Sequence, residues 1–248
     1  MNGRNVAQAT GCQACGGELD SAAQPETRAC WYCGRSGTTA VACRNGHYLC
    51  DSCHSLPAND LIERHCTVTE EPDPLAMALT LMRNPSLKMH GPEHHFLVAA
   101  VLITAWSIER ANRDRVPLLL ATARARAEDT RGDYCGKHGA CGAAMGAGIA
   151  YSVITGAKPL SAQDWRLVNL MTATCLTSVA ESGGPRCCKR DTFLSIMTAV
   201  GFLNNNAGTA LPVSGAPACE FSNLNRECPT TECSFYRGTQ APGEAAQA

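Results

Sequence analysis

Sixteen cysteines in a chain of 248 residues are the side chains with the clearest capacity for chemistry in this sequence. Seven of them, together with one histidine, lie in the segments CQAC, CWYC and CRNGHYLCDSC near the N-terminus. A C-x2-C turn aims two thiolates at one ion, and eight ligands fill two closed tetrahedral zinc sites. The spacing leaves open whether the ligand pairs combine sequentially or interleave. The predicted zinc ligands are Cys12, Cys15, Cys30, Cys33, Cys43, His47, Cys50 and Cys53.

The segment ACRNGHYLCDSC resembles the central part of RING fingers, including their Gly-His step. A RING finger supplies its last cysteine pair downstream, whereas here only Cys66 follows and the extra pair, Cys12 and Cys15, lies upstream. The chain therefore lacks the pair that a ubiquitin ligase of this type requires. We expect a structural or docking zinc module instead, because closed zinc sites rarely carry out chemistry.

A second group of reactive side chains lies in the segment MHGPEHHFL, where an apolar helix is expected to start at Pro92. Four ionisable groups, His90, Glu93, His94 and His95, enter this helix together. A single histidine in such a place more often caps or packs a helix, but the set of four favours a catalytic site. The predicted acid/base is His90 or His94, and Glu93 is expected to face the same site.

Cysteines also begin two further predicted helices. YCGKHGACGAAMGAGI carries Cys135 and Cys141 among glycines, which permit a close backbone approach to a bulky inorganic group. SGGPRCCKRD places Cys187 and Cys188 on a first turn, where free amides and the helix dipole stabilise thiolates. Since neighbours diverge by about 100° around a helix, one is expected to bind metal and the other to pack or serve as a reserve nucleophile.

Charged and sulfur-bearing groups nearby complete the predicted site. Arg190, with Arg186, is expected to hold a substrate carboxylate by forked hydrogen bonds, the alternative being ordinary solvated charges. The tail CEFSNLNRECPTTECSFY suits iron–sulfur or zinc ligation, either completing the same site or binding a metal of its own. Its candidate ligands are Cys219, Cys228 and Cys233.

The elements that must position these groups are mainly α-helical. Residues 1–56 are expected to form the zinc-ribbon or RING-like module, 57–74 a polar linker with prolines, 75–238 a helical metal- or cluster-binding domain, and 239–248 a disordered tail. The helical part shows no strand alternation, and its longest apolar run, FLVAAVLITAW, is too short to span a bilayer.

Composition narrows the partners and the location. A net charge of -1, a pI of about 6.6 and 5% aromatic residues argue against a nucleic-acid partner. The first ten residues, MNGRNVAQAT, contain no apolar signal core, so a cytoplasmic location is expected. In that compartment the cysteines are expected to bind metals rather than to form disulfides.

The motifs MHGPEHH, CGACGAAMGAGI and GGPRCCKRD, with the spaced cysteines of the tail, resemble a cysteine-rich domain family of unknown function. The resemblance covers nearly the whole chain. Some relatives in that family are joined to S-adenosylmethionine-dependent methyltransferase domains, which implies an accessory role beside a methyltransferase or redox partner. This chain has no glycine-rich methyltransferase fingerprint of its own.

The order of these motifs is also distantly similar to the α region of iron–sulfur L-serine dehydratases and cysteine desulfidases. The resemblance gives Cys141 the first cysteine position, and Gly183, Gly184 and Cys187 the second. It implies a [4Fe–4S] cluster held by three cysteines, with an open iron that polarises the leaving hydroxyl or thiol. The third position is open to Cys135, Cys188 or a tail cysteine.

Two hypotheses follow. The first is an intracellular metalloprotein with two zinc ions and an iron–sulfur cluster, with lyase-like or sulfur-related activity on a small anionic substrate. The second is a non-enzymatic zinc-binding adaptor or metal carrier that serves a methyltransferase or redox partner. The histidines at 90–95 favour the enzyme, since an adaptor has no evident use for them.

Overall fold

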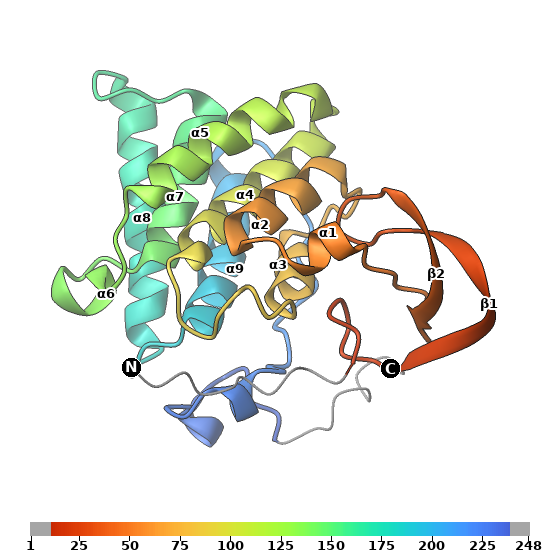
Figure 1. The fold of residues 1–248 in the computed structure, drawn as a ribbon. Helices are drawn as coiled ribbons and strands as arrows, with labels where there is room; N and C mark the ends of the chain where they lie inside the picture. Colours follow the sequence, from red (N-terminus) through yellow and green to blue (C-terminus); the bar gives the residue numbers. More distant parts are fainter. Residues whose placement is uncertain (1–10, 239–248) are drawn as a thin grey trace.

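The computed structural model describes residues 11–238, which form a small two-stranded module and a larger helical body (Figure 1). The predicted mainly α fold is confirmed. Strands β1 (Leu19–Ala29) and β2 (Ser36–Cys43) pair antiparallel. The helices of the described part are α1 (Asp51–His54), α2 (Ala58–Val68), α3 (Pro74–Met82), α4 (Glu93–Glu109), α5 (Val116–Glu128), α6 (Tyr134–Lys137), α7 (Gly142–Thr155), α8 (Ala162–Glu181) and α9 (Cys188–Asn206).

Helix α4 is the centre of the helical body, and α2, α3, α5, α7 and α9 all pack against it. Its sequence is apolar around the whole circumference, which is the pattern of a helix enclosed by others. Helix α7 approaches α4 closely because Gly146 lies against the backbone carbonyl of His95. Gly148 lies equally close to Thr172 of α8. Gly146 and Gly148 therefore serve the packing of helices. None of the helices within residues 11–238 is both long and apolar enough to cross a membrane.

Residues 57–74, predicted as a linker, contain the packed helix α2. Leu61, Ile62 and Cys66 lie on one face of α2 and are completely buried in the main core. The prolines that suggested a linker flank the helices: Pro57 precedes α2 and Pro74 is the first residue of α3, a position where proline is well tolerated. The predicted disordered tail, 239–248, lies outside the described residues.

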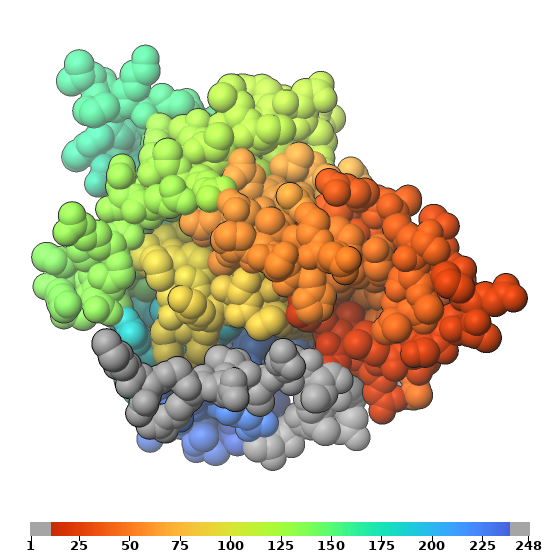
Figure 2. Space-filling view, viewed as in Figure 1, coloured from red at the N-terminus to blue at the C-terminus, as the bar shows by residue number. Residues whose placement is uncertain are grey.

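The N-terminal module is fastened to the helical body and projects from one side of it (Figure 2). Tyr32 is fully buried, and its hydroxyl lies 2.9 Å from the carbonyl oxygen of Gln13 and 3.2 Å from that of Thr80 in α3. Its ring meets His65 of α2 edge-on at 5.6 Å between centroids. The module and the helices consequently share one hydrophobic core.

The C-terminal segment 207–238 has no helix longer than the single 3-10 turns Ser222–Leu224 and Thr230–Glu232. It runs beneath one end of the helical body (Figure 1). Arg83 forms an ion pair with Glu220, and Phe193 of α9 meets Phe235 edge-on at 5.3 Å. Side-chain contacts with the helices, rather than regular backbone pairing, therefore hold this segment in place.

Candidate metal centres and helix-end pocket

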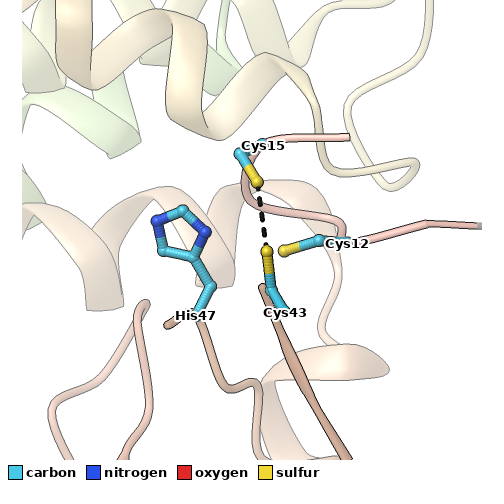
Figure 3. Close-up of side chains that lie close together, drawn as sticks. All are labelled: Cys12, Cys15, Cys43 and His47. Carbon is cyan, nitrogen blue, oxygen red and sulfur yellow. Dashed lines mark hydrogen bonds between the residues drawn. The ribbon is translucent and has the colours of Figure 1, made fainter. Parts of the chain in front are cut away.

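The first candidate metal centre consists of Cys12, Cys15, Cys43 and His47, whose ligand atoms all lie within 4.8 Å of one another (Figure 3). The sulfurs of Cys15 and Cys43 are 3.4 Å apart. The backbone amide of Ala14 donates to the Cys12 sulfur at 3.4 Å, and that of Asn45 donates to Cys43 at 3.3 Å. Amide donors of this kind favour the thiolate form, which is the form that binds metal.

The second centre consists of Cys30, Cys33, Cys50 and Cys53, again with ligand atoms within 4.8 Å of one another. Burial acts to raise the pKa of Cys30, but the amides of Cys50, Cys33 and Tyr32 lower it to about 7. Arg64 of α2 donates to the Cys53 sulfur at 3.6 Å, which ties this centre to the helical body. All eight predicted zinc ligands are thus brought together in two groups. One group offers three cysteines and a histidine and the other four cysteines, and both are donor sets of closed tetrahedral sites.

The ligand pairs interleave, and the β-hairpin explains why. In the register of the hairpin, Leu19 at the start of β1 faces Cys43 at the end of β2, so the first and third ligand pairs meet at one end. At the other end, just after β1, Cys30 forms an isolated β-bridge with Tyr48, which places Cys30 and Cys33 next to the chain that leads into α1. The question that spacing left open is therefore decided by strand register.

The helical body contains a separate cavity of about 150 Å³, which we call the helix-end pocket. Its lining includes the first residues of α4, α7 and α9, so three helix N-termini meet there. Free amides and helix dipoles make such a place favourable for an anion or a thiolate. The ionisable side chains in its lining are His90, His94, His95, Asp133, Tyr134, Cys135, Cys141, Arg186, Cys188 and Asp191.

The adjacent cysteines of α9 serve two different cavities. Cys188 lines the helix-end pocket with Cys135 and Cys141, whereas Cys187 lines a second cavity with the tail cysteines. The structure therefore does not put the two preferred cluster ligands, Cys141 and Cys187, in one pocket. Burial raises the pKa of Cys141 to about 11 and that of Cys188 to about 12, so a bound cation is needed to keep these thiols ionised.

His94, a predicted acid/base, belongs to the lining of the helix-end pocket but is almost completely buried. Its side chain is 1% exposed. Its Nδ1 accepts from the hydroxyl of Thr192 at 2.9 Å, while its Nε2 donates to the carbonyl of Lys88 at 3.0 Å. Burial, reinforced by the charge of Lys189, lowers its pKa to about 3. Both ring nitrogens are therefore engaged, and His94 joins α4, α9 and the preceding loop.

This burial makes stability depend on pH. The folded protein holds His94 neutral down to about pH 3, whereas the unfolded chain protonates it near its ordinary value of 6.5. The contribution of neutral His94 to the free energy of unfolding is fully present above pH 6.5 and is lost as the pH falls below that value. The loss amounts to about 1.4 kcal/mol between pH 7.5 and 5.5. Urea unfolding at these two pH values should show this loss for the wild type and a smaller one for His94→Gln. Equal losses in both proteins would contradict the assignment.

Two other predicted catalytic residues lie outside the lining of the helix-end pocket. Glu93 is buried, and its Oε1 accepts the amide of Lys88 at 2.8 Å. Arg190 is 4% exposed and donates from Nη2 to the carbonyls of Gly183, at 2.8 Å, and Pro185, at 3.1 Å. Both side chains are thus held by the loops that precede their helices.

Two other side chains in the lining of the pocket have the chemistry predicted for the acid/base and for the carboxylate-binding group. Arg186 lines it with a side chain that is 48% exposed and donates to Asp133 at 2.7 Å. His95 lines it as well, and its Nδ1 donates to the carbonyl of Thr130 at 3.1 Å, which leaves Nε2 as the unprotonated nitrogen. Gly142 lies against this imidazole, where any Cβ would overlap the ring. The sequence contained the signal for His95, but adjacent residues of one segment gave no means of choosing between His94 and His95.

His90 also lines the pocket, and its Nε2 lies 3.2 Å from Oδ1 of Asn225 in the tail. That oxygen accepts the amide of Glu227 too, so Nε2 of His90 is the donor in this contact. Asn225 in turn lines the cavity of the tail cysteines. His90 therefore links the two cavities and is held in position by the C-terminal segment.

These features define a mainly helical, cysteine-rich protein with two groups of side chains suited to metal binding. The family of unknown function DUF5714 matches residues 62–236, more than half of the chain, and the chain belongs to this family. A domain family of unknown function is thus confirmed for residues 62–236, whereas no comparison shows the predicted similarity to L-serine dehydratases. The matched range includes the helix-end pocket and the tail cysteines, whereas the two N-terminal metal-type groups precede it. No curated protein and no solved structure matches the chain.

Proposed function

We propose that this protein is an iron–sulfur metalloprotein whose helix-end pocket carries out a lyase-like or sulfur-related reaction on a small anionic substrate. One observation carries the proposal: three thiols, an imidazole with an unprotonated nitrogen and a guanidinium line one cavity where three helix N-termini meet. We infer zinc for the two N-terminal groups, because closed donor sets of cysteine and histidine are typical of structural zinc.

Cys135, Cys141 and Cys188 are suited to hold an iron–sulfur cluster in this pocket. Among residues 11–238, only the two N-terminal groups have three ligand atoms mutually within 4.8 Å. The three pocket thiols do not form such a close group, and a cluster in which each thiolate binds its own iron does not require one. With three protein ligands, such a cluster supplies an open iron that acts as a Lewis acid on a leaving hydroxyl or thiol.

The remaining groups of the pocket bind and deprotonate the substrate. Arg186 holds its carboxylate, supported by the amides at the starts of the helices. Nε2 of His95 accepts the proton from the carbon next to that carboxylate, while the Thr130 carbonyl holds the tautomer that leaves Nε2 free. His90 acts as a positioning residue, because Asn225 fixes its ring.

The proposal predicts a specific effect of removing the guanidinium. In Arg186→Gln, kcat/KM is expected to fall about 10- to 100-fold, mostly through KM, because a charge-assisted hydrogen bond to the carboxylate is lost. Turnover of L-serine and L-cysteine by the anaerobically purified chain, read as release of ammonia and sulfide, measures this. Arg166→Gln, a change at the start of α8 that lies outside the pocket lining, is the matched control. A chain that contains no iron when isolated without oxygen would reject the proposal.

A further inference from the structure

A separate cavity is lined by four cysteines from the second half of the chain. None of them lines the helix-end pocket, and the one remaining cysteine of this half, Cys175, lies in the core. We call this separate cavity the tail cavity. Most of the other side chains in its lining are apolar, and three of them are the aromatic rings of Phe193, Phe221 and Phe235. A hydrophobic shell around a group of thiols limits the access of solvent to a metal centre bound there. The cysteines are Cys187, Cys219, Cys228 and Cys233.

Irregular backbone of the tail brings these cysteines together with the start of α9. The amide of Cys219 donates to the carbonyl of Phe235 at 2.8 Å, which joins the two ends of the tail segment. The amide of Phe221 donates to the Cys219 sulfur at 3.4 Å. Cys12 and Cys43 of the first candidate metal centre make the same contact, in which the amide two residues after the cysteine donates to its sulfur. The tail thus contains the same local turn that presents a thiolate in the candidate zinc site.

Two buried cations stand beside the cavity. Lys189 is 2% exposed, and its Nζ lies 4.6 Å from the centroid of the Phe221 ring. Arg190 is 4% exposed and lines the cavity itself. A centre with four thiolate ligands carries negative charge, and a buried charge is stable only when an opposite one compensates it. The positive charges of these residues are therefore placed where such a centre needs them.

We propose that the tail cavity binds a second iron–sulfur cluster, held by Cys187, Cys219, Cys228 and Cys233 and distinct from the centre in the helix-end pocket. No three of these thiols meet the 4.8 Å limit that both N-terminal groups satisfy within the described part of the chain. Four thiolates on four different irons stand farther apart than four on one ion, so a cluster does not require the close grouping that a zinc site does. Cys228 is followed by Pro229, a step also found in bacterial ferredoxins.

The test uses the full chain, reconstituted without oxygen with ferrous iron and sulfide, with iron, zinc and sulfide counted per chain. Cys219→Ser and Cys233→Ser are each expected to lose about four iron atoms and an equal amount of sulfide, while zinc stays unchanged. Cys175→Ala is the matched control, because Cys175 is fully buried in α8 and lines neither cavity. Loss of zinc instead of iron, or no loss of metal, overturns the proposal.

Two further measurements keep the result interpretable. The double variant Cys135→Ser/Cys188→Ser should retain the tail cluster, and if it keeps all the iron of the wild type, the pocket proposal fails while this one stands. In the wild type, Cys219, Cys228 and Cys233 are partly exposed, so iodoacetamide should modify them at least tenfold faster after an iron chelator has been applied. Equal rates before and after chelation overturn the proposal without relying on any variant.

Discussion

Cys30→Ser is expected to unfold the N-terminal module and to weaken its attachment to the helical body. Cys30 is buried in the four-cysteine centre, and binding free energies of structural zinc sites are about 10–16 kcal/mol in small peptides. A serine hydroxyl does not replace a thiolate ligand, so most of this stabilisation should be lost. Since Tyr32 is two residues away and belongs to the shared core, its packing on α2 and α3 should be lost as well.

Zinc content and limited proteolysis measure this effect. The variant should hold about one zinc ion per chain instead of two, and a protease should cleave it within the first 56 residues far faster than it cleaves the wild type. Cys66→Ala is the matched control, because Cys66 is a fully buried cysteine of α2 that belongs to neither metal-type group. If Cys66→Ala loses zinc to the same extent, the assignment of ligands is wrong.

The largest effect on the proposed activity is expected from Cys188→Ser, and the same change one residue earlier should have a different result. Cys188 lines the helix-end pocket, so its replacement should remove the pocket iron and reduce turnover to that of the metal-free chain. Cys187 lines the tail cavity, so Cys187→Ser should instead remove the tail iron and leave the pocket occupied. Each variant is thereby the control for the other.

Iron per chain and turnover of L-serine and L-cysteine, measured on the same anaerobic preparations, decide this comparison. Each variant is expected to lose about four iron atoms, but only Cys188→Ser should lose turnover. The division of the two thiols would be contradicted if both variants lost the same iron and the same activity.

Local patterns were enough to predict the helical class and the eight side chains that form the two candidate metal centres of the N-terminal module. C-x2-C spacing acts within one turn, so it does not depend on the rest of the fold. The pairing of the ligands was beyond reach because it depends on strand register, with Leu19 facing Cys43. The helix at 58–68 was missed because prolines on both sides of it have the same composition as a linker.

The sequence also located the helix-end pocket better than it assigned its residues. His90, His94, Cys135, Cys141 and Cys188 were predicted as site residues and do line the cavity. His94 and His95 are neighbours that both line it, and they differ in their hydrogen bonds, since both ring nitrogens of His94 are engaged but only Nδ1 of His95. Arg186 and Arg190 present the same problem at the start of α9, where the bonds of Arg190 to a preceding loop are a tertiary feature.

The packing of Tyr32 against α2 and α3 has a consequence for relatives of this protein. The family match begins within α2, so a homologue that consists of the matched region alone would lack the side chain that fills the space between His65 and Thr80. In that homologue, the apolar surface of α2 and α3 that Tyr32 covers here would be exposed to solvent. We expect such a homologue to carry smaller or more polar residues around this site, or to cover it with another side chain of its own.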